Sequence, residues 1–267
     1  MHITVNGQPV TVQAQSLFAL KAELQDHAEV VILNGYQTAE DLPLRDGDTV
    51  TLIRKGVMPA EPELEQMLCA RHTPAVHEKV KNASIAIAGL GGLGSNIAVM
   101  LARTGVGRLL LVDFDTVEPS NLNRQCYFIS HLGMKKTEAM QSQLRQINPY
   151  ITVETETVLV TAENAAELFR DADIICEAFD DPAAKATLTN TVLTAFPEKK
   201  LVASSGMAGY GSANTIRTRK VFRNLYLCGD GETAAQPGCG LMAPRVTVCA
   251  AHQANMILRL LLNMDEP

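Results

Sequence analysis

The stretch SIAIAGLGGLGS, residues 84–95, decides the fold of this protein. It begins with an unbroken apolar run, typical of a buried strand, and a helical pattern follows its glycines. Between the two, a G-x-G-x-x-G spacing places Gly89, Gly91 and Gly94, with Gly92 as an additional glycine. Such glycines allow a tight turn and let phosphate or ribose approach the backbone at a helix N-terminus. The stretch predicts a nucleotide-binding loop, with an ordinary strand–helix turn as the alternative.

The regions on either side of this loop predict two different domains. In residues 81–267, strand-like runs alternate with helical patterns, which predicts an α/β fold with a Rossmann-like, doubly wound, mainly parallel sheet. Residues 1–57 combine a hairpin signal at Asn6-Gly7, one short helix and further strands, which predicts a small β-grasp (ubiquitin-like) domain. The intervening segment 58–80 contains prolines and a glycine, and we expect a linker followed by helical pieces broken at Pro74.

Composition excludes several classes of protein. The chain has 267 residues, a formal net charge of −6 and no basic run, so nucleic acid is not expected as the main partner. The N-terminus lacks the pattern of a signal peptide, and no apolar run is long enough for a membrane span. None of the six cysteines forms a C-x-x-C pair. We therefore expect a cytoplasmic protein with reduced thiols and no structural zinc.

The stretch DFDTVEPSNLNRQ, residues 113–125, argues against a nicotinamide enzyme. Asp113 follows the second predicted strand, where an acid binds ribose hydroxyls, but a dinucleotide site needs neither Asp115 nor Asn121. Arg124 adds a permanent cation whose planar guanidinium suits phosphate oxygens.

Two further residues extend this pattern toward a triphosphate. Lys136 follows in GMKK, and its G-x-x-K spacing from Gly133 favours it over Lys135. Asp180 ends a later predicted strand, and a carboxylate beside a triphosphate usually holds Mg²⁺. Either cation alone could be a solvated surface charge. Together with the acids and the glycine loop, they predict an ATP site.

The combination GLGGLGS, LVDFDTVEPSNLNRQ, GMKK and FDD resembles the ThiF/MoeB-type activating enzymes, relatives of the ubiquitin-activating enzymes. The resemblance runs from about residue 80 to 267. It implies an adenylyltransferase that uses Mg-ATP to adenylate the C-terminal glycine of a small β-grasp sulfur carrier. It implies Gly92 at the phosphates, Asp113 on the ribose and Asp180 on magnesium. The triphosphate would be surrounded by four residues: Asp115, Asn121, Arg124 and Lys136. The family forms dimers in which one subunit supplies an arginine to the other, and Arg71 is the candidate here.

The first 57 residues resemble ThiS, the sulfur carrier itself, through LRDGDTVTLI. A working carrier ends in a free Gly-Gly, whereas this chain continues as RKGVMPAEPE. The unit therefore cannot be adenylated in place, and it is either a docking or regulatory domain or a passive stabilising appendage.

Two departures from the family stand out. The C-x-x-C pairs that bind zinc in many relatives are missing, and Asp181 follows Asp180 where the family usually has Asn. Some relatives use a loop cysteine for covalent sulfur chemistry. Cys228 or Cys239 could serve here, although cysteines that only pack are the commoner case.

Several functions remain compatible with the residues. The first is adenylation of a separate ThiS-like carrier in thiamine (thiazole) biosynthesis. The second is the same chemistry on a molybdopterin-type carrier or a tRNA-bound carboxylate, the latter disfavoured by the acidic charge. A non-catalytic ATP-binding scaffold and an NAD-linked oxidoreductase are the remaining alternatives.

Overall fold

A computed structural model describes residues 1–57, 63, 67, 72 and 74–267 of the chain. Arg71, the predicted dimer arginine, lies outside the described residues. The chain divides into two compact units, Met1–Glu78 and Lys79–Pro267.

The N-terminal unit contains a five-stranded sheet in the order β2-β1-β5-β3-β4. β1 and β2 form an antiparallel hairpin, and the left-handed backbone of Asn6 and Gly7, with φ of 47° and 77°, fits the turn between them. β1 pairs parallel to β5, while β3 pairs antiparallel to both β4 and β5. The strands are β1 (His2–Val5), β2 (Gln8–Thr11), β3 (Val30–Leu33), β4 (Tyr36–Thr38) and β5 (Thr49–Ile53).

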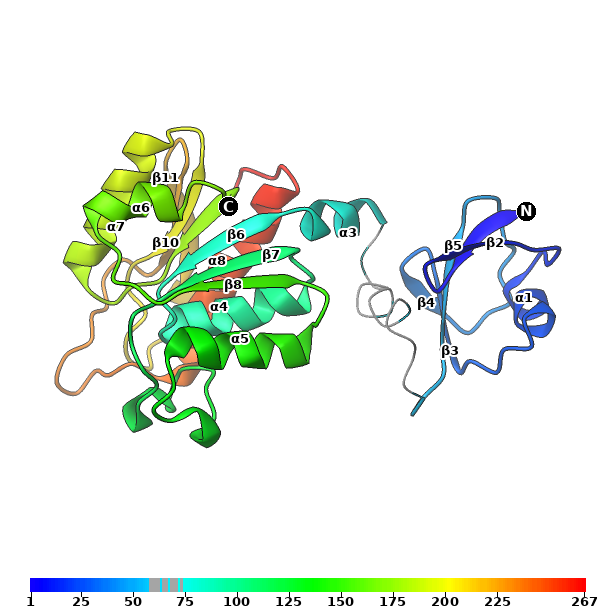
Figure 1. Cartoon of the computed structure of the whole chain (residues 1–267), viewed down its shortest axis with the longest axis horizontal. Helices are drawn as coiled ribbons and strands as arrows, with labels where there is room; N and C mark the ends of the chain where they lie inside the picture. Colours follow the sequence, from blue (N-terminus) through cyan, green and yellow to red (C-terminus); the bar gives the residue numbers. More distant parts are fainter. Residues whose placement is uncertain (58–62, 64–66, 68–71, 73) are drawn as a thin grey trace. The chain divides into compact units, whose positions relative to one another are not determined.

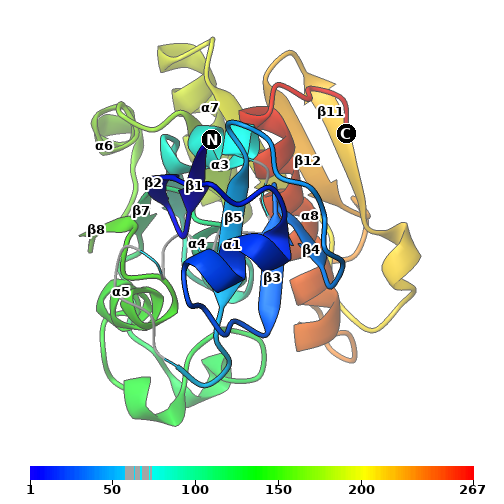
Figure 2. The same ribbon diagram turned by 90° about the vertical axis from the view of Figure 1, so that its right-hand side faces the viewer.

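One helix, α1 (Leu17–Glu23), crosses this sheet (Figure 2). The Ser16 side chain caps its start by accepting a hydrogen bond from the Ala19 N–H. Leu17 and Leu20 of α1 are buried against a cluster that includes Val50 and Leu52 of β5. The predicted β-grasp fold is confirmed.

The second unit contains a seven-stranded sheet in the order β11-β12-β10-β9-β6-β7-β8 (Figure 1). All neighbouring strands run parallel except β11 and β12, which form an antiparallel pair. The strands are β6 (Ser84–Ala88), β7 (Arg108–Val112), β8 (Thr152–Glu156), β9 (Ile174–Glu177), β10 (Lys200–Ser204), β11 (Arg217–Phe222) and β12 (Leu225–Gly229). The predicted doubly wound, mainly parallel sheet is confirmed.

Helices cover both faces of this sheet (Figure 1). One face carries α4, α5 and α8, which contact one another through α4, and the other carries α6 and α7. Their bounds are α4 (Gly92–Arg103), α5 (Lys136–Ile147), α6 (Ala162–Leu168), α7 (Pro182–Ala195) and α8 (Ala243–Leu261). Before the sheet, α3 (Pro74–Lys81) begins at the proline where the sequence predicted a break. None of the helices described is long and apolar enough to cross a membrane.

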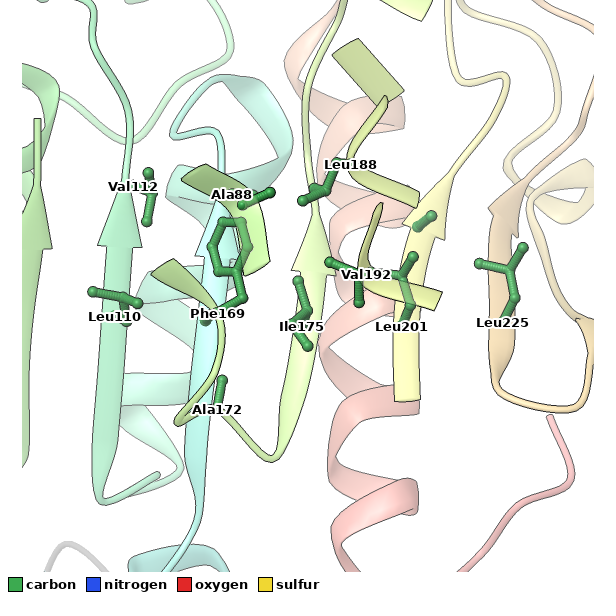
Figure 3. Close-up of a cluster of buried hydrophobic side chains, with 13 residues drawn as sticks. Ala88, Leu110, Val112, Phe169, Ala172, Ile175, Leu188, Val192, Leu201 and Leu225 are labelled. Carbon is green, nitrogen blue, oxygen red and sulfur yellow. The ribbon is translucent and has the colours of Figure 1, made fainter. Parts of the chain in front are cut away.

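The core beneath α6 and α7 explains why the central strands β6, β7, β9 and β10 are largely apolar. Figure 3 shows Phe169, Leu188 and Val192 packed on side chains from β6, β7, β9, β10 and β12. The alternate residues of the same strands, such as Ile87 and Leu111, are equally buried on the face that α4, α5 and α8 cover. A sheet that is buried on both faces cannot show polar alternation.

The strand order reverses between β6 and β9. From β6 the chain proceeds outward to β7 and β8, and then returns to the other side of β6 to form β9. In register, Ala88 of β6 lies beside Val112 of β7 and Glu177 of β9. The residues that directly follow these three strands therefore meet at one edge of the sheet. In doubly wound folds this switch point is where ligands bind.

Candidate functional site

The glycine loop connects β6 to α4 at this switch point, and close contacts fix its sequence. Gly89 has a φ of +93°, and a Cβ there would lie 2.8 Å from the Ala178 carbonyl oxygen. At Gly94 a Cβ would lie only 1.8 Å from the Gly89 carbonyl oxygen. Both positions require glycine because backbone, which cannot move aside, occupies the space. Gly91 is open by comparison, since a Cβ there would meet nothing nearer than the Gln125 side chain at 3.9 Å.

Asp113, the predicted ribose ligand, holds the loop in place. Its carboxylate accepts hydrogen bonds from the Leu90 N–H at 2.6 Å and from the Asp115 N–H at 2.8 Å. The residue is 8% exposed. Because an ionised carboxylate has about four acceptor positions, these two bonds leave capacity for ribose hydroxyls.

Tyr127 supports the same loop and was not predicted. Its hydroxyl donates a hydrogen bond of 2.9 Å to the Leu90 carbonyl, so both polar groups of the Leu90 backbone are occupied. Burial, with the Asp113 charge adding to it, raises the pKa of the Tyr127 phenol, which keeps this group a neutral donor. In the sequence, the position of Tyr127 shortly after Arg124 was the only signal that it supports the loop.

Asp115 and Lys136, both predicted around the triphosphate, form an ion pair with each other. Lys136 Nζ lies 2.8 Å from Asp115 Oδ2, and the lysine side chain is 7% exposed. The rival Lys135 is exposed and donates to the Phe114 carbonyl. Lys136 is therefore the lysine that the fold directs inward, with Asp115 as its counter-ion.

Arg124 lies against the glycine loop. A Cβ at Gly92 would come within 3.3 Å of Arg124 Cγ, which places the aliphatic part of the arginine directly over that glycine. Its guanidinium donates to the Asn123 side chain and the Ser120 carbonyl. It forms no ion pair with any residue that the structure describes.

Two asparagines shape the segment that carries Arg124. Asn121 ends a 3₁₀ turn, Pro119–Asn121, and its Oδ1 accepts a hydrogen bond from the Glu118 N–H at 3.0 Å. Asn96 of α4, which was not predicted, donates to the carbonyls of both Gly92 and Arg124. The predicted Asn121 thus fixes the turn, and Asn96 connects the arginine backbone to the loop.

Asp180 and Asp181 follow β9 and have different roles. Asp181 caps α7 by accepting a hydrogen bond of 2.7 Å from the Ala184 N–H. Asp180 is exposed, and no hydrogen bond or ion pair to another described residue involves its carboxylate. The acid that departs from the family pattern therefore has a structural role, and its neighbour is available for a ligand.

A magnesium ion fits this donor set. Mg²⁺ retains several waters and usually takes one or two protein carboxylates together with substrate phosphates. Asp180 meets that requirement, because it supplies one free carboxylate at the edge of the sheet where the glycine loop lies. The described part of the chain contains no cluster of three or more His, Cys, Asp or Glu that could hold a metal by itself.

The two candidate cysteines differ in access. Cys228 is fully buried at the end of β12, and burial raises the pKa of its thiol to about 11, so it is protonated at neutral pH. A thiol in that state is a poor nucleophile, which argues against Cys228. Cys239 is partly exposed in the loop between β12 and α8.

The sequence analysis did not predict two ion pairs that lie near this edge of the sheet. Lys185 Nζ lies 3.0 Å from Glu177 Oε2, and Arg245 Nη2 lies 2.6 Å from Asp230 Oδ2. Hydrogen bonds from the Thr233 and Glu232 N–H groups, the Thr233 hydroxyl and Arg245 hold the pKa of Asp230 below its usual value, although burial opposes this. The glutamate within the apolar run IICEAF was a usable signal, because a charge in a buried strand needs a partner.

Together, the fold and this arrangement define an α/β protein with a glycine-loop site at the switch point of its sheet. Residues 64–267 match the model of the ThiF family, and residues 1–56 match that of ThiS-like ubiquitin. The chain belongs to the ThiF family.

Similar proteins carry related names. The chain is 31% identical over 193 residues to an "Adenylyltransferase and sulfurtransferase UBA4" of Kluyveromyces lactis, covering 70% of this chain and 43% of that protein. It is 38% identical over 117 residues to a "Sulfur carrier protein adenylyltransferase" of Thermus thermophilus, covering 43% of each chain. The chain thus spans less than half the length of these two relatives.

A solved structure supports the fold. The E. coli tRNA N6-threonylcarbamoyladenosine dehydratase TcdA, in complex with ATP, superposes with a TM-score of 0.69 at 23% identity, covering 78% of this chain and 98% of that one. At this identity the likeness concerns the fold alone.

Proposed function

We propose that this protein is an ATP-dependent adenylyltransferase that activates the C-terminal glycine of a separate ThiS-like sulfur carrier. The carrier carboxylate would attack the α-phosphate of ATP to form carrier-CO-AMP and release pyrophosphate. Membership of the ThiF family supports the reaction class, and a relative named as a sulfur carrier protein adenylyltransferase supports the substrate class. The observation that carries the proposal is the pair Arg124 and Asp180, both without an ion-pair partner among the described residues, at the glycine-loop edge.

The chemistry suits these residues. A carboxylate nucleophile is already ionised at pH 7, so the reaction needs no general base. It needs stabilisation of negative charge as pyrophosphate leaves. Arg124 would contact the phosphate oxygens. The ammonium group of Lys136 would turn from Asp115 toward the same oxygens. Asp113 would bind the ribose. Gly91 and Gly92 would let the phosphates approach the loop backbone, and Gly89 and Gly94 would keep the loop in the tight turn that places it there.

Magnesium would be held by Asp180 and the phosphates. When bound, it would neutralise charge on the triphosphate and orient pyrophosphate as the leaving group. Asp115 and Asn121 would shape the same site from the segment before Arg124. We further propose a cytoplasmic homodimer in which Arg71 of one subunit completes the site of the other.

The N-terminal ThiS-like unit is not the substrate in this proposal. Its last strand continues through Arg54 into a turn in which Gly56 has a φ of +73° and the Val57 N–H donates to the Arg54 carbonyl. A peptide bond therefore occupies the position where a carrier would present its reactive carboxylate. We propose that the unit docks or regulates, and that the pathway is thiazole formation for thiamine.

The test is ATP–[³²P]pyrophosphate exchange by the purified chain, with and without a separate ThiS-like carrier that ends in Gly-Gly. Exchange that depends on this carrier is the expected result. Exchange only with a molybdopterin-type carrier or a tRNA-bound carboxylate would keep the chemistry and reject the thiamine pathway. ATP binding without exchange for any of these substrates would reject the enzyme and favour a non-catalytic scaffold.

A further inference from the structure

A buried ion pair brackets the turn that carries Asp180. Glu177 is the last residue of β9, and its side chain is 1% exposed. Lys185 lies in the first turns of α7, and its ammonium group is 3.0 Å from both carboxylate oxygens of Glu177. The same ammonium donates to the hydroxyl and the carbonyl oxygen of Ser204 at the end of β10.

The pair fixes both sides of this turn. Oε1 of Glu177 accepts a 2.6 Å hydrogen bond from the Phe179 N–H, so the carboxylate that anchors Lys185 also holds the backbone next to Asp180. The Glu177 carbonyl accepts a hydrogen bond from Gln253 of α8. The ion pair therefore joins the two ends of segment 178–181, because Glu177 precedes the segment and Lys185 lies in the helix that follows it.

This arrangement does more than the stability of the fold requires. A buried ion pair often contributes no more stability than apolar side chains of the same volume, because both charges lose their hydration. The residues before it in β9 are apolar, with Ile175 and Cys176 fully buried, and its polar neighbours are Ser204 and Gln253. The pair does, however, fix the geometry of the turn, which apolar packing would not do as specifically.

We propose that Glu177 and Lys185 are positioning residues that hold the β9–α7 turn so that the Asp180 carboxylate faces the magnesium ion of bound ATP. This inference rests on the proposed function, because it takes from there the role of Asp180. It adds that the affinity of the site for magnesium depends on two residues that touch neither metal nor nucleotide.

The test is calorimetric titration of ATP into the full chain over a series of Mg²⁺ concentrations. In Lys185→Met we expect the Mg²⁺ concentration for half-maximal strengthening of ATP binding to rise by about tenfold, the usual effect of removing the support of a metal ligand. Affinity for ATP without metal should stay near that of the wild type. Lys185→Arg should restore the magnesium dependence.

Because Lys185→Met leaves a buried carboxylate unpaired, the double variant Glu177→Gln/Lys185→Met provides a second test without that cost. The matched control is Arg108→Met, which breaks the Arg108–Glu154 ion pair at the opposite end of β7. The control should lower the melting temperature without changing the magnesium dependence, as any purely structural loss would.

The outcomes separate this inference from the proposed function. A folded double variant with wild-type magnesium dependence would overturn the positioning role alone. Wild-type protein without exchange for any carrier, but with a Lys185-dependent response to magnesium, would overturn the proposed function and support the positioning role. Wild-type protein that binds no ATP would overturn both.

Discussion

The two units of this chain use polar side chains differently. In the N-terminal unit, they complete the fold itself: Asn6 exchanges two hydrogen bonds with the Leu52 backbone, and Asp26 pairs with Arg54. In the ThiF unit, Arg124 and Asp180 have no ion-pair partner among the described residues, whereas Asp115 and Glu177 pair with Lys136 and Lys185. The contrast is consistent with the proposed division between an ATP site in the ThiF unit and a docking or regulatory N-terminal unit.

This contrast is sharpest at the ends of the strands. After β5 the chain enters a turn, and Arg54 at its start pairs with Asp26. After β6, β7 and β9 the chain forms loops whose backbone is fixed by Asp113, Tyr127 and Glu177. Beside these loops, Arg124 and Asp180 form no ion pair with a described residue. The variants below test whether the two kinds of residue differ in function as they do in structure.

The largest effect is expected from Arg124→Ala. Loss of the cation should lower the rate of carrier-dependent pyrophosphate exchange by about 100- to 1,000-fold, because charge on the departing pyrophosphate loses a fixed donor. The melting temperature should change little, since the guanidinium has no ion pair to lose. Arg145→Ala, on the exposed side of α5, is the control. Equal exchange by the two variants would contradict the proposed site.

The second prediction concerns two glycines of the same loop. Gly94→Ala should destabilise the fold by about 3 kcal/mol, because its Cβ meets backbone that is fixed on both sides. Gly91→Ala should cost no more than about 1 kcal/mol, as expected at an open N-cap position. Urea unfolding of both variants provides the comparison, and similar losses of stability would show that the loop is less constrained than described.

A smaller effect is expected from Tyr127→Phe. Removing its hydroxyl deletes one hydrogen bond to the glycine loop and should lower the free energy of unfolding by about 1 kcal/mol. Tyr210→Phe, at a tyrosine that is 81% exposed, should leave stability unchanged. Chemical denaturation measures both, and a Tyr127→Phe variant as stable as the wild type would remove Tyr127 from the support of the loop.

The smallest effect lies in the N-terminal unit. The hydrogen bond from Arg54 lowers the pKa of Asp26 below its usual value of 3.8. A lowered folded-state pKa contributes stability above about pH 4 and loses it as pH falls through the folded-state value. Asp26→Asn should therefore cost only about 3 °C or less in melting temperature at pH 7, and the difference should become smaller in acid.

Calorimetry at pH 7 and pH 3 tests this sign. A difference that grows in acid would contradict it. Exchange activity should not change, and a large loss of activity would show that the N-terminal unit takes a direct part in catalysis.

The sequence predicts the fold where local signals agree with the tertiary structure. The Asn6-Gly7 turn and the run before Gly89 are examples, because turn chemistry and unbroken apolar strands need no distant information. The pair β11–β12 was not predicted. Arg217–Phe222 is largely exposed, and only its pairing with β12 makes it a strand. The charged residues of this strand have no alternation that would distinguish its sequence from that of a loop.

The candidate site shows the same division. Asp113, Arg124 and Asp180 could be located because the residues after parallel strands meet at one edge of the sheet. Their supports could not, because Glu177 meets Lys185 only through the packing of α7 on β9 and β10. Asp115 and Lys136 were predicted near the same ligand, but that they pair with each other depends on a contact 21 residues apart.

The clamp that Asp113 and Tyr127 place on Leu90 has a consequence for the kinetics of nucleotide capture. Both backbone groups of Leu90 are hydrogen-bonded to side chains of the protein itself, so the contacts that order this part of the loop come from the protein and not from a ligand. Binding of an anion would then carry little entropic cost for ordering the loop. Association would be limited by diffusion and charge rather than by a slow rearrangement, and improvements in affinity would come from slower release.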